Sequence, residues 1–78
     1  MYFFVNYKED QGCVTEIRAY VVEGDHDWPE QVFKGPDAVE QLRAWAAQHP
    51  FVTGFSTRNF LDPEEMERVR KMLKGAVL

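Results

Sequence analysis

The amino-acid sequence predicts an α+β fold, in which two amphipathic helices cover one face of a small antiparallel sheet of three or four strands. Strand-like patterning fills the first half of the chain, and helical periodicity fills the second half. The length of 78 residues allows a single domain, 1–78. Hydrophobic residues make up 45% of the chain and aromatic residues 14%, which favours a packed core over disorder.

The first half predicts a β-hairpin. Residues 2–8 are aromatic and β-branched, residues 9–12 have turn chemistry, and residues 13–23 alternate between two faces. The more apolar face of the second strand carries Cys13, Thr15, Ile17, Ala19 and Val21. We expect this face to meet the core, so the alternation also predicts a buried, unreactive thiol at Cys13.

Two further segments have weaker strand character. After a predicted loop at 24–27, a short third strand is expected around residues 31–33, and Pro29 confines it to a sheet edge or to its own first residue. Residues 51–60 are rich in Phe, Val and Thr. They form either part of an additional strand or an ordered loop.

The first predicted helix begins at Asp37 and ends before Pro50, since the residue before a proline disfavours the helical conformation. Asp37 and Glu40 have the spacing of a capping box. Apolar and aromatic positions recur at helical spacing at Ala38, Val39, Leu42, Trp45, Ala46 and His49. We expect His49, at the helix end, to cap backbone carbonyls.

The second predicted helix has Asp62 as its cap, Pro63 in its first position and Glu65 completing another capping box. Its apolar stripe consists of Met66, Val69, Met72 and Leu73. Ion pairs at i,i+4 spacing are expected between Glu64 and Arg68 and between Glu67 and Lys71.

The charge balance places the acidic excess in the predicted sheet. The chain has 13 acidic and 9 basic side chains, a net charge of −4, which argues against a general binder of nucleic acid or anionic membranes. Residues 1–40 hold nine acids and three bases, a net of −6. Residues 41–78 hold four acids and six bases, a net of +2. The predicted sheet would therefore repel phosphate.

The sequence predicts a cytoplasmic protein. Its one cysteine allows no internal disulfide, whereas small secreted domains usually carry several, so a reducing compartment is favoured. The apolar run at residues 2–5 is too short for a signal peptide or a membrane span.

Catalytic and metal-binding signals are weak. The sequence has no nucleophile elbow, P-loop or dinucleotide fingerprint, so we expect neither an enzyme nor a cofactor. One loop is crowded with potential ligands: Glu23, Asp25, His26, Asp27 and Glu30. Carboxylates and imidazole bind divalent ions, but the spacing matches neither a calcium loop nor a zinc motif. We expect a solvated acidic loop and no metal.

Protein binding is the function that the sequence favours. If both helices cover one sheet face, the other face leaves aromatic and charged side chains exposed, and tyrosines flanked by charges are typical of protein-recognition surfaces. An ordinary half-covered sheet, whose outer side chains pack on each other, is the alternative. The predicted binding residues are Tyr7, Glu16, Arg18, Tyr20, Asp25, Asp27 and Glu30.

Two hypotheses use this surface. In the first, an acidic inhibitor binds a nucleic-acid-handling protein complex, and its acidic groups occupy a basic nucleic-acid channel of the partner. In the second, the chain is a homo-oligomeric accessory protein, for example a homodimer, without catalytic activity.

The layout resembles a known family. The features are the chain length, an opening strand with Tyr7, a second strand with Tyr20 near its end, and a helix in which residues 40–45 read Glu-Gln-Leu-x-x-Trp. Together they resemble the small phage-encoded anti-CRISPR proteins of the type I-F class. The segment Trp28-Pro29 and the stretch 51–60 depart from that family's pattern.

The resemblance implies a small antiparallel sheet with two helices on one side. It also implies binding to backbone subunits of the CRISPR surveillance complex in the host cytoplasm, which blocks hybridisation with target DNA. The family's contact surface uses sheet tyrosines and an acidic residue. Tyr20 matches one tyrosine by position, Tyr7 matches approximately, and Glu30 stands for the acidic residue.

Overall fold

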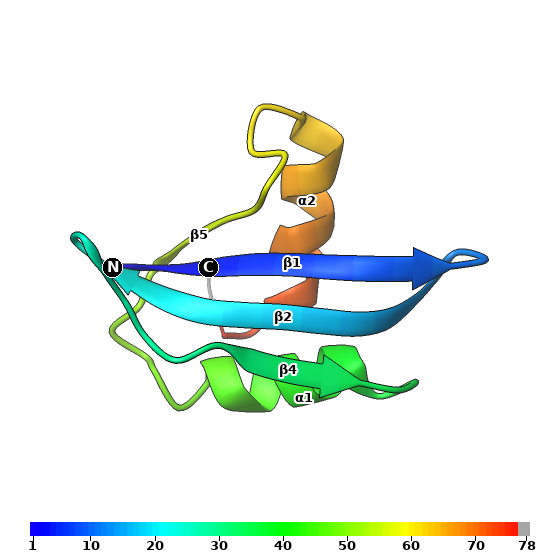
Figure 1. Ribbon diagram of the computed structural model, residues 1–78, viewed down its shortest axis with the longest axis horizontal. Coiled ribbons are helices and arrows are strands. Elements are labelled where there is room, and N and C mark those ends of the chain that lie inside the picture. Colours follow the sequence, from blue (N-terminus) through cyan, green and yellow to red (C-terminus); the bar gives the residue numbers. More distant parts are fainter. Residues whose placement is uncertain (77–78) are drawn as a thin grey trace.

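The centre of the sheet is a long antiparallel hairpin in the computed structural model, which describes residues 1–76 (Figure 1). The elements in chain order are β1 (Tyr2–Asp10), β2 (Cys13–Glu23), β3 (His26–Asp27), β4 (Gln31–Lys34), α1 (Ala38–Ala46), β5 (Gly54–Ser56) and α2 (Pro63–Met72). None of the helices in the described part of the chain is long and apolar enough to cross a membrane.

The predicted α+β class is confirmed, although the sheet has five strands and is mixed. Strands β3 and β4 both pair antiparallel with β2, while β5 pairs parallel with β1 beside Tyr2–Phe4. A helix and a loop separate β5 from β4, so no tight turn imposes an antiparallel direction on it. The predicted third strand is β4, part of 51–60 is β5, and the expected loop at 24–27 contains the short strand β3.

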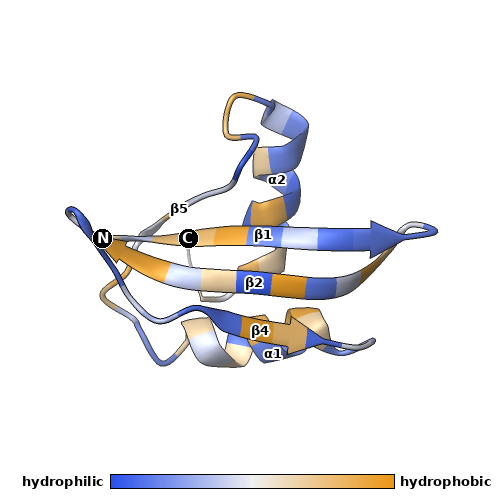
Figure 2. Cartoon of the chain, viewed as in Figure 1, coloured by the Kyte–Doolittle hydropathy of each residue, from blue (hydrophilic) through white to orange (hydrophobic). Residues whose placement is uncertain are grey.

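Both helices lie on the same face of the sheet. On β1, Phe3 and Tyr7 point to the same side; the Phe3 ring lies 5.2 Å from the Trp45 ring of α1, and the Tyr7 hydroxyl donates a hydrogen bond to Glu65 of α2. The fully buried core between the layers includes Phe3, Val5, Ile17, Ala19, Val21, Leu42, Val69 and Leu73. Figure 2 shows the corresponding apolar start of β1 and the hydrophilic second half of the same strand.

A β-bulge near the hairpin end changes which side chains face the core. The β1–β2 register shifts between Lys8 and Glu9, so Lys8 pairs with Glu16 but Glu9 pairs with Val14. Ile17, Ala19 and Val21 are buried as predicted. Beyond the bulge the alternation is inverted. Val14 packs against the core and Cys13 is exposed, so the prediction of a buried thiol at Cys13 was wrong.

The two helix starts differ from the predicted capping boxes. Asp62 does cap α2, accepting a hydrogen bond of 2.9 Å from the Glu64 backbone N–H, and Pro63 begins the helix. Asp37 precedes α1 but makes no side-chain cap, and its carboxylate instead accepts a hydrogen bond from the Gln41 side chain. Neither Glu40 nor Glu65 completes a box; the Glu65 carboxylate is held by other partners.

The ion pairs on α2 follow i,i+3 rather than the predicted i,i+4 spacing. Arg68 pairs with Glu65, and Arg70 pairs with Glu67. Arg68 turns toward Glu65 because it also reaches Glu9 on β1, at 3.7 Å. Tertiary contact therefore decides which of two helical neighbours it pairs with.

His49 lies beyond the end of α1, which stops at Ala46. Its ring packs among four aromatic rings, at centroid distances of 5.4 to 6.4 Å, which belong to Phe3, Trp28, Trp45 and Phe51. The expected role as a cap of helix carbonyls is therefore replaced by aromatic packing, because the chain turns after Ala46 and brings the imidazole over the core.

Candidate functional site

The face of the sheet turned away from both helices is the candidate site, here named the outer sheet face. The register places its side chains in four rows across the strands. In order from the β3 end, the rows are Tyr2, Val22 and Asp27; Ser56, Phe4 and Tyr20; Asn6, Arg18 and Val32; and Lys8, Glu16 and Lys34.

Apolar side chains gather at one end of the outer sheet face and form an aromatic patch, defined as Tyr2, Phe4, Tyr20, Val22 and Val32. Phe4 and Tyr20 are cross-strand partners whose rings stack at 5.3 Å with an interplanar angle of 25°. Such a pair stabilises the hairpin. Tyr2 and Val32 remain 39% and 42% exposed, so mutual packing leaves part of the patch open to solvent.

Acidic groups border the aromatic patch. Asp27 lies beside Val22 across β2 and β3, and Glu30 reaches the same face to form an ion pair of 3.1 Å with Arg18. Burial, together with the nearby Asp27, Tyr2 and Glu30, raises the pKa of Tyr20 above its ordinary value of 10.0. The Tyr20 hydroxyl is therefore a neutral hydrogen-bonding group at neutral pH, at the acidic rim of an apolar surface.

The opposite end of the outer sheet face is a charged row in which the carboxylate of Glu16 interacts with three basic side chains. Glu16 lies between Lys8 and Lys34, 3.7 Å from each ammonium group, and it accepts a hydrogen bond of 3.0 Å from Arg18. The hydrogen bond from Arg18, with the charges of Lys8 and Lys34, lowers the pKa of Glu16 below its ordinary value of 4.5. This end of the face carries a net positive charge.

The predicted site residues divide between the two faces and a turn. Glu16, Arg18, Tyr20, Asp27 and Glu30 are brought together on the outer sheet face. Asp25 lies exposed in the turn between β2 and β3. Tyr7 lies on the helix-covered side, because it is separated from Val5 and Phe3 by steps of two along β1.

Sequence reasoning left six contributors to the aromatic patch and the charged row out of the predicted site: Tyr2, Phe4, Lys8, Val22, Val32 and Lys34. Alternation along β1 divides the strand into two sets of side chains, but both sets are aromatic. Val32 and Phe33 are adjacent apolar residues on a short strand, and only the pairing of Ile17 with Phe33 decides which of them faces the core. The signal was present in the sequence, but the register was needed to interpret it.

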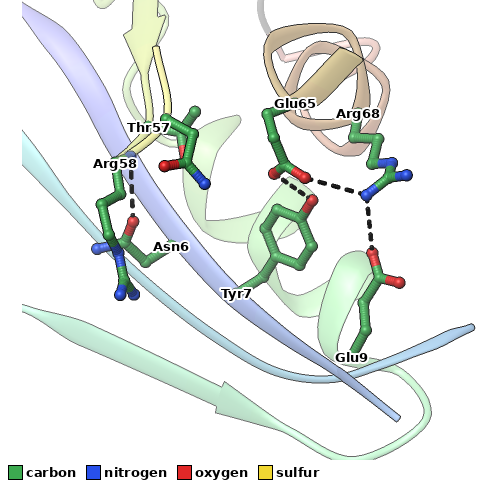
Figure 3. Close-up of a pocket in the computed structure, with 8 residues that line it drawn as sticks. Asn6, Tyr7, Glu9, Thr57, Arg58, Glu65 and Arg68 are labelled. Atoms are coloured by element: carbon green, nitrogen blue, oxygen red, sulfur yellow. Dashed lines mark hydrogen bonds and ion pairs between the residues drawn. The ribbon is translucent and has the colours of Figure 1, made fainter. Parts of the chain in front are cut away.

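Tyr7 lines a polar pocket of about 410 Å³ at the edge of β1, here named the edge groove (Figure 3). Its other lining residues are Asn6, Glu9, Thr57, Arg58, Asn59, Glu65 and Arg68. The Tyr7 hydroxyl donates a hydrogen bond of 2.5 Å to Glu65, which also accepts one of 3.0 Å from Arg68. Burial and the hydrogen bond to Glu65 raise the pKa of Tyr7 above 10.0.

The chemistry of both surfaces suits non-covalent recognition. Within residues 1–76, no three His, Cys, Asp or Glu side chains are grouped so that they could hold a metal ion. The acidic residues between Glu23 and Glu30 are spread over β2, β3 and their connections, and Glu23 and Glu30 are bound to Trp28 and Arg18. Stacked aromatics, neutral hydroxyls and paired charges are the groups that protein interfaces use.

Comparisons with protein-family models, curated proteins and solved structures find no match to this chain. The case for a function therefore depends on the geometry of the two surfaces.

Proposed function

We propose that this chain is a protein-binding module that uses the outer sheet face, with the aromatic patch at the centre of the contact. The observation that carries the proposal is a group of apolar side chains on the side of the sheet that neither helix covers, with Tyr2 and Val32 still about two-fifths exposed. Aromatic anchors surrounded by charged groups are the usual centre of protein interfaces.

The chemistry around the patch indicates the complementary surface. Asp27 and Glu30 border Tyr20, so the matching partner presents an apolar centre flanked by lysine or arginine on that side. At the other end of the face, the excess of basic side chains around Glu16 is complementary to an acidic group on the partner. A surface with both signs of charge sets the orientation of the partner as well as attracting it.

The partner in this proposal is a basic, nucleic-acid-handling protein complex of the cytoplasm. Inhibition follows because acidic side chains bound in a basic channel exclude nucleic acid from it. The resemblance to the type I-F anti-CRISPR proteins supplies one concrete candidate, the CRISPR surveillance complex. Tyr20 and Glu30, which the resemblance assigns to that family's contact residues, both belong to the surface proposed here.

A charge-reversal experiment tests the proposal. The tagged wild type and the triple variant Tyr20→Ala, Asp27→Lys, Glu30→Lys are each used to capture proteins from host lysate, with a purified surveillance complex as a defined partner. The wild type is expected to retain a partner that the variant loses, and retention should weaken as salt rises. The matched control Glu40→Lys, Glu67→Lys makes the same change of charge on the helices and should retain the partner.

Equal retention by the triple variant and the wild type would show that the outer sheet face is not the binding surface. Sedimentation velocity separates the alternative, a homo-oligomer formed through the same face. The proposal expects a monomer at micromolar concentration. A dimer that the triple variant dissociates would assign the face to self-association instead.

A further inference from the structure

The edge of β1 is open beyond the point where β5 stops. β5 pairs only with Tyr2–Phe4, whereas β1 continues to Asp10. Among the described strands, none pairs with residues 6–10 on this side. In an antiparallel pair, every second residue directs its backbone N–H and C=O away from the partner strand. The second half of β1 therefore presents backbone groups that suit another strand.

The edge groove lies along this open stretch and continues the line of β5. After Ser56 the chain turns aside: Thr57 is only 3% exposed, and the Arg58 N–H donates a hydrogen bond of 3.3 Å to the Asn6 side chain. The groove is lined by Asn6 from one face of the sheet and Tyr7 from the other, so it encloses the strand edge rather than one face (Figure 3). Its volume of about 410 Å³ lies within the range of ligand-binding pockets.

The two walls of the groove carry opposite charge. Arg58 lies beside Asn6 on one side of β1, and no carboxylate of the described residues lies within ion-pair distance of its guanidinium (Figure 3). On the other side, Glu9 and Glu65 share the single guanidinium of Arg68, which leaves a net negative charge. Successive side chains of an added strand would face these two walls in turn.

We propose that the edge groove binds an extended peptide segment of a partner protein, which adds to the sheet beside residues 6–10 of β1. In this strand, an acidic side chain pairs with Arg58, and the neighbouring residue is basic and lies against Glu9 and Glu65. Backbone hydrogen bonds supply affinity and the two side chains supply selectivity, as in other cases of strand addition. The charged end of β1, Lys8 to Asp10, discourages unselective pairing.

This site is separate from the aromatic patch, and its test needs no natural partner. The probe is the acetylated and amidated hexapeptide Thr-Val-Glu-Lys-Val-Thr, titrated into the isotope-labelled full chain and followed by amide NMR. We expect saturable shifts at residues 6–10 and at Arg58. Two further peptides, N-methylated at odd or at even positions, each lose the donors of one strand edge, and at least one of them should no longer bind.

Charge reversal then tests the selectivity. Arg58→Glu should weaken binding of the Glu-Lys peptide about fivefold, which corresponds to the loss of one surface ion pair. The same variant should bind a Lys-Lys version of the peptide more tightly than the wild type does. Lys74→Glu, the same charge change beyond the far end of α2, should leave both affinities unchanged. Arg58 is exposed, so folding is not at risk.

Several results would overturn the proposal. They are an absence of shifts at residues 6–10 at millimolar peptide, shifts confined to the outer sheet face, and equal binding of the parent and both N-methylated peptides. Amide NMR shifts at residues 6–10 that change with protein concentration in the absence of peptide would also overturn it. They would show that a second copy of this chain pairs with the strand edge.

Discussion

Tyr7 and Tyr20 lie on neighbouring strands, yet their hydroxyl groups have different tasks. Tyr7 points toward α2, and its hydroxyl donates a hydrogen bond to Glu65, so it ties the sheet to a helix. Tyr20 points to the outer sheet face, stacks on Phe4 and lies close to acidic groups. Tyr7 therefore has a structural role, and Tyr20 lies on the surface proposed for recognition.

We expect Tyr7→Phe to destabilise the protein by about 1 kcal/mol, because a half-buried hydrogen bond to a carboxylate is lost and Glu65 keeps only Arg68. The free energy of unfolding in urea measures the change. The matched variant Tyr20→Phe, whose hydroxyl makes no hydrogen bond with the described residues, should change it by less than about 0.5 kcal/mol. If the two variants are equally destabilised, Tyr7 does not couple the sheet to α2.

The lowered pKa of Glu16 predicts how the stability of the protein depends on pH. The pKa of Glu16 is lower in the folded protein than its ordinary value of 4.5, mainly because of the hydrogen bond from Arg18. A folded-state pKa below the unfolded one adds stability above the unfolded pKa, and this is lost as the pH falls through the folded pKa. Wild type should therefore be more stable than Glu16→Gln at pH 7, and the difference should shrink below pH 4.5. A difference that is constant from pH 7 to pH 3 would contradict this assignment.

Residue-level prediction from the sequence succeeded where alternation was unbroken. Ile17, Ala19 and Val21 are buried as expected. It failed at Cys13, because the bulge between Lys8 and Glu9 inverts the alternation and leaves no mark in the sequence of β2. It also could not decide between the two aromatic faces of β1, since only helix packing distinguishes them.

The helix ends of this protein are held by unequal means. Asp62 caps α2 through the Glu64 N–H, whereas Asp37 makes no cap at α1. Asp62→Ala should therefore cost about 1 kcal/mol of unfolding free energy, and Asp37→Ala only a few tenths. Chemical denaturation of the two variants checks this, and equal losses would mean that Asp37 caps α1 in solution.

A side chain of α1 holds the C-terminal end of α2. Arg43 donates hydrogen bonds of 3.0 Å to the Met72 carbonyl and 2.9 Å to the Lys71 carbonyl, and its charge complements the helix C-terminus. We expect Arg43→Ala to destabilise the protein by about 1–2 kcal/mol. Arg43→Lys should restore less than half of this, because an ammonium group lacks the planar pair of donors. Thermal unfolding measures both, and full rescue by lysine would contradict the two-carbonyl geometry.

The positions of the helices and of the long strands were predictable, but their connections to one another were not. Apolar spacing and Pro63 were sufficient to locate α2, and the aromatic run with the turn at 9–12 located the hairpin. The parallel pairing of β5 depends on where the chain returns after α1, and the Arg43 contact joins residues that are 29 positions apart. Local patterns do not carry such long-range information.

At the scale of the whole molecule, the fold separates the helix-covered packing face from the outer sheet face, which we propose as the recognition surface. The helices cover one face and leave the outer sheet face with an apolar patch bordered by acidic groups at one end and a basic row at the other. The net charge of −6 in residues 1–40 describes this face incompletely, because Lys8, Arg18 and Lys34 are collected around Glu16. The register therefore turns an acidic half-chain into a surface with two charged ends.

The affinity of a captured partner for two aromatic-to-alanine variants tests the central proposal most directly. Isothermal titration would compare Tyr20→Ala on the outer sheet face with Phe51→Ala, after circular dichroism has shown that both are folded. Phe51 is an exposed aromatic residue beside His49 and belongs to neither proposed surface. We predict that Tyr20→Ala weakens binding about tenfold or more, as expected for a central anchor, and that Phe51→Ala changes it by less than about twofold. Unchanged affinity of Tyr20→Ala, or an equal loss in Phe51→Ala, would contradict the assignment of the outer sheet face as the binding surface.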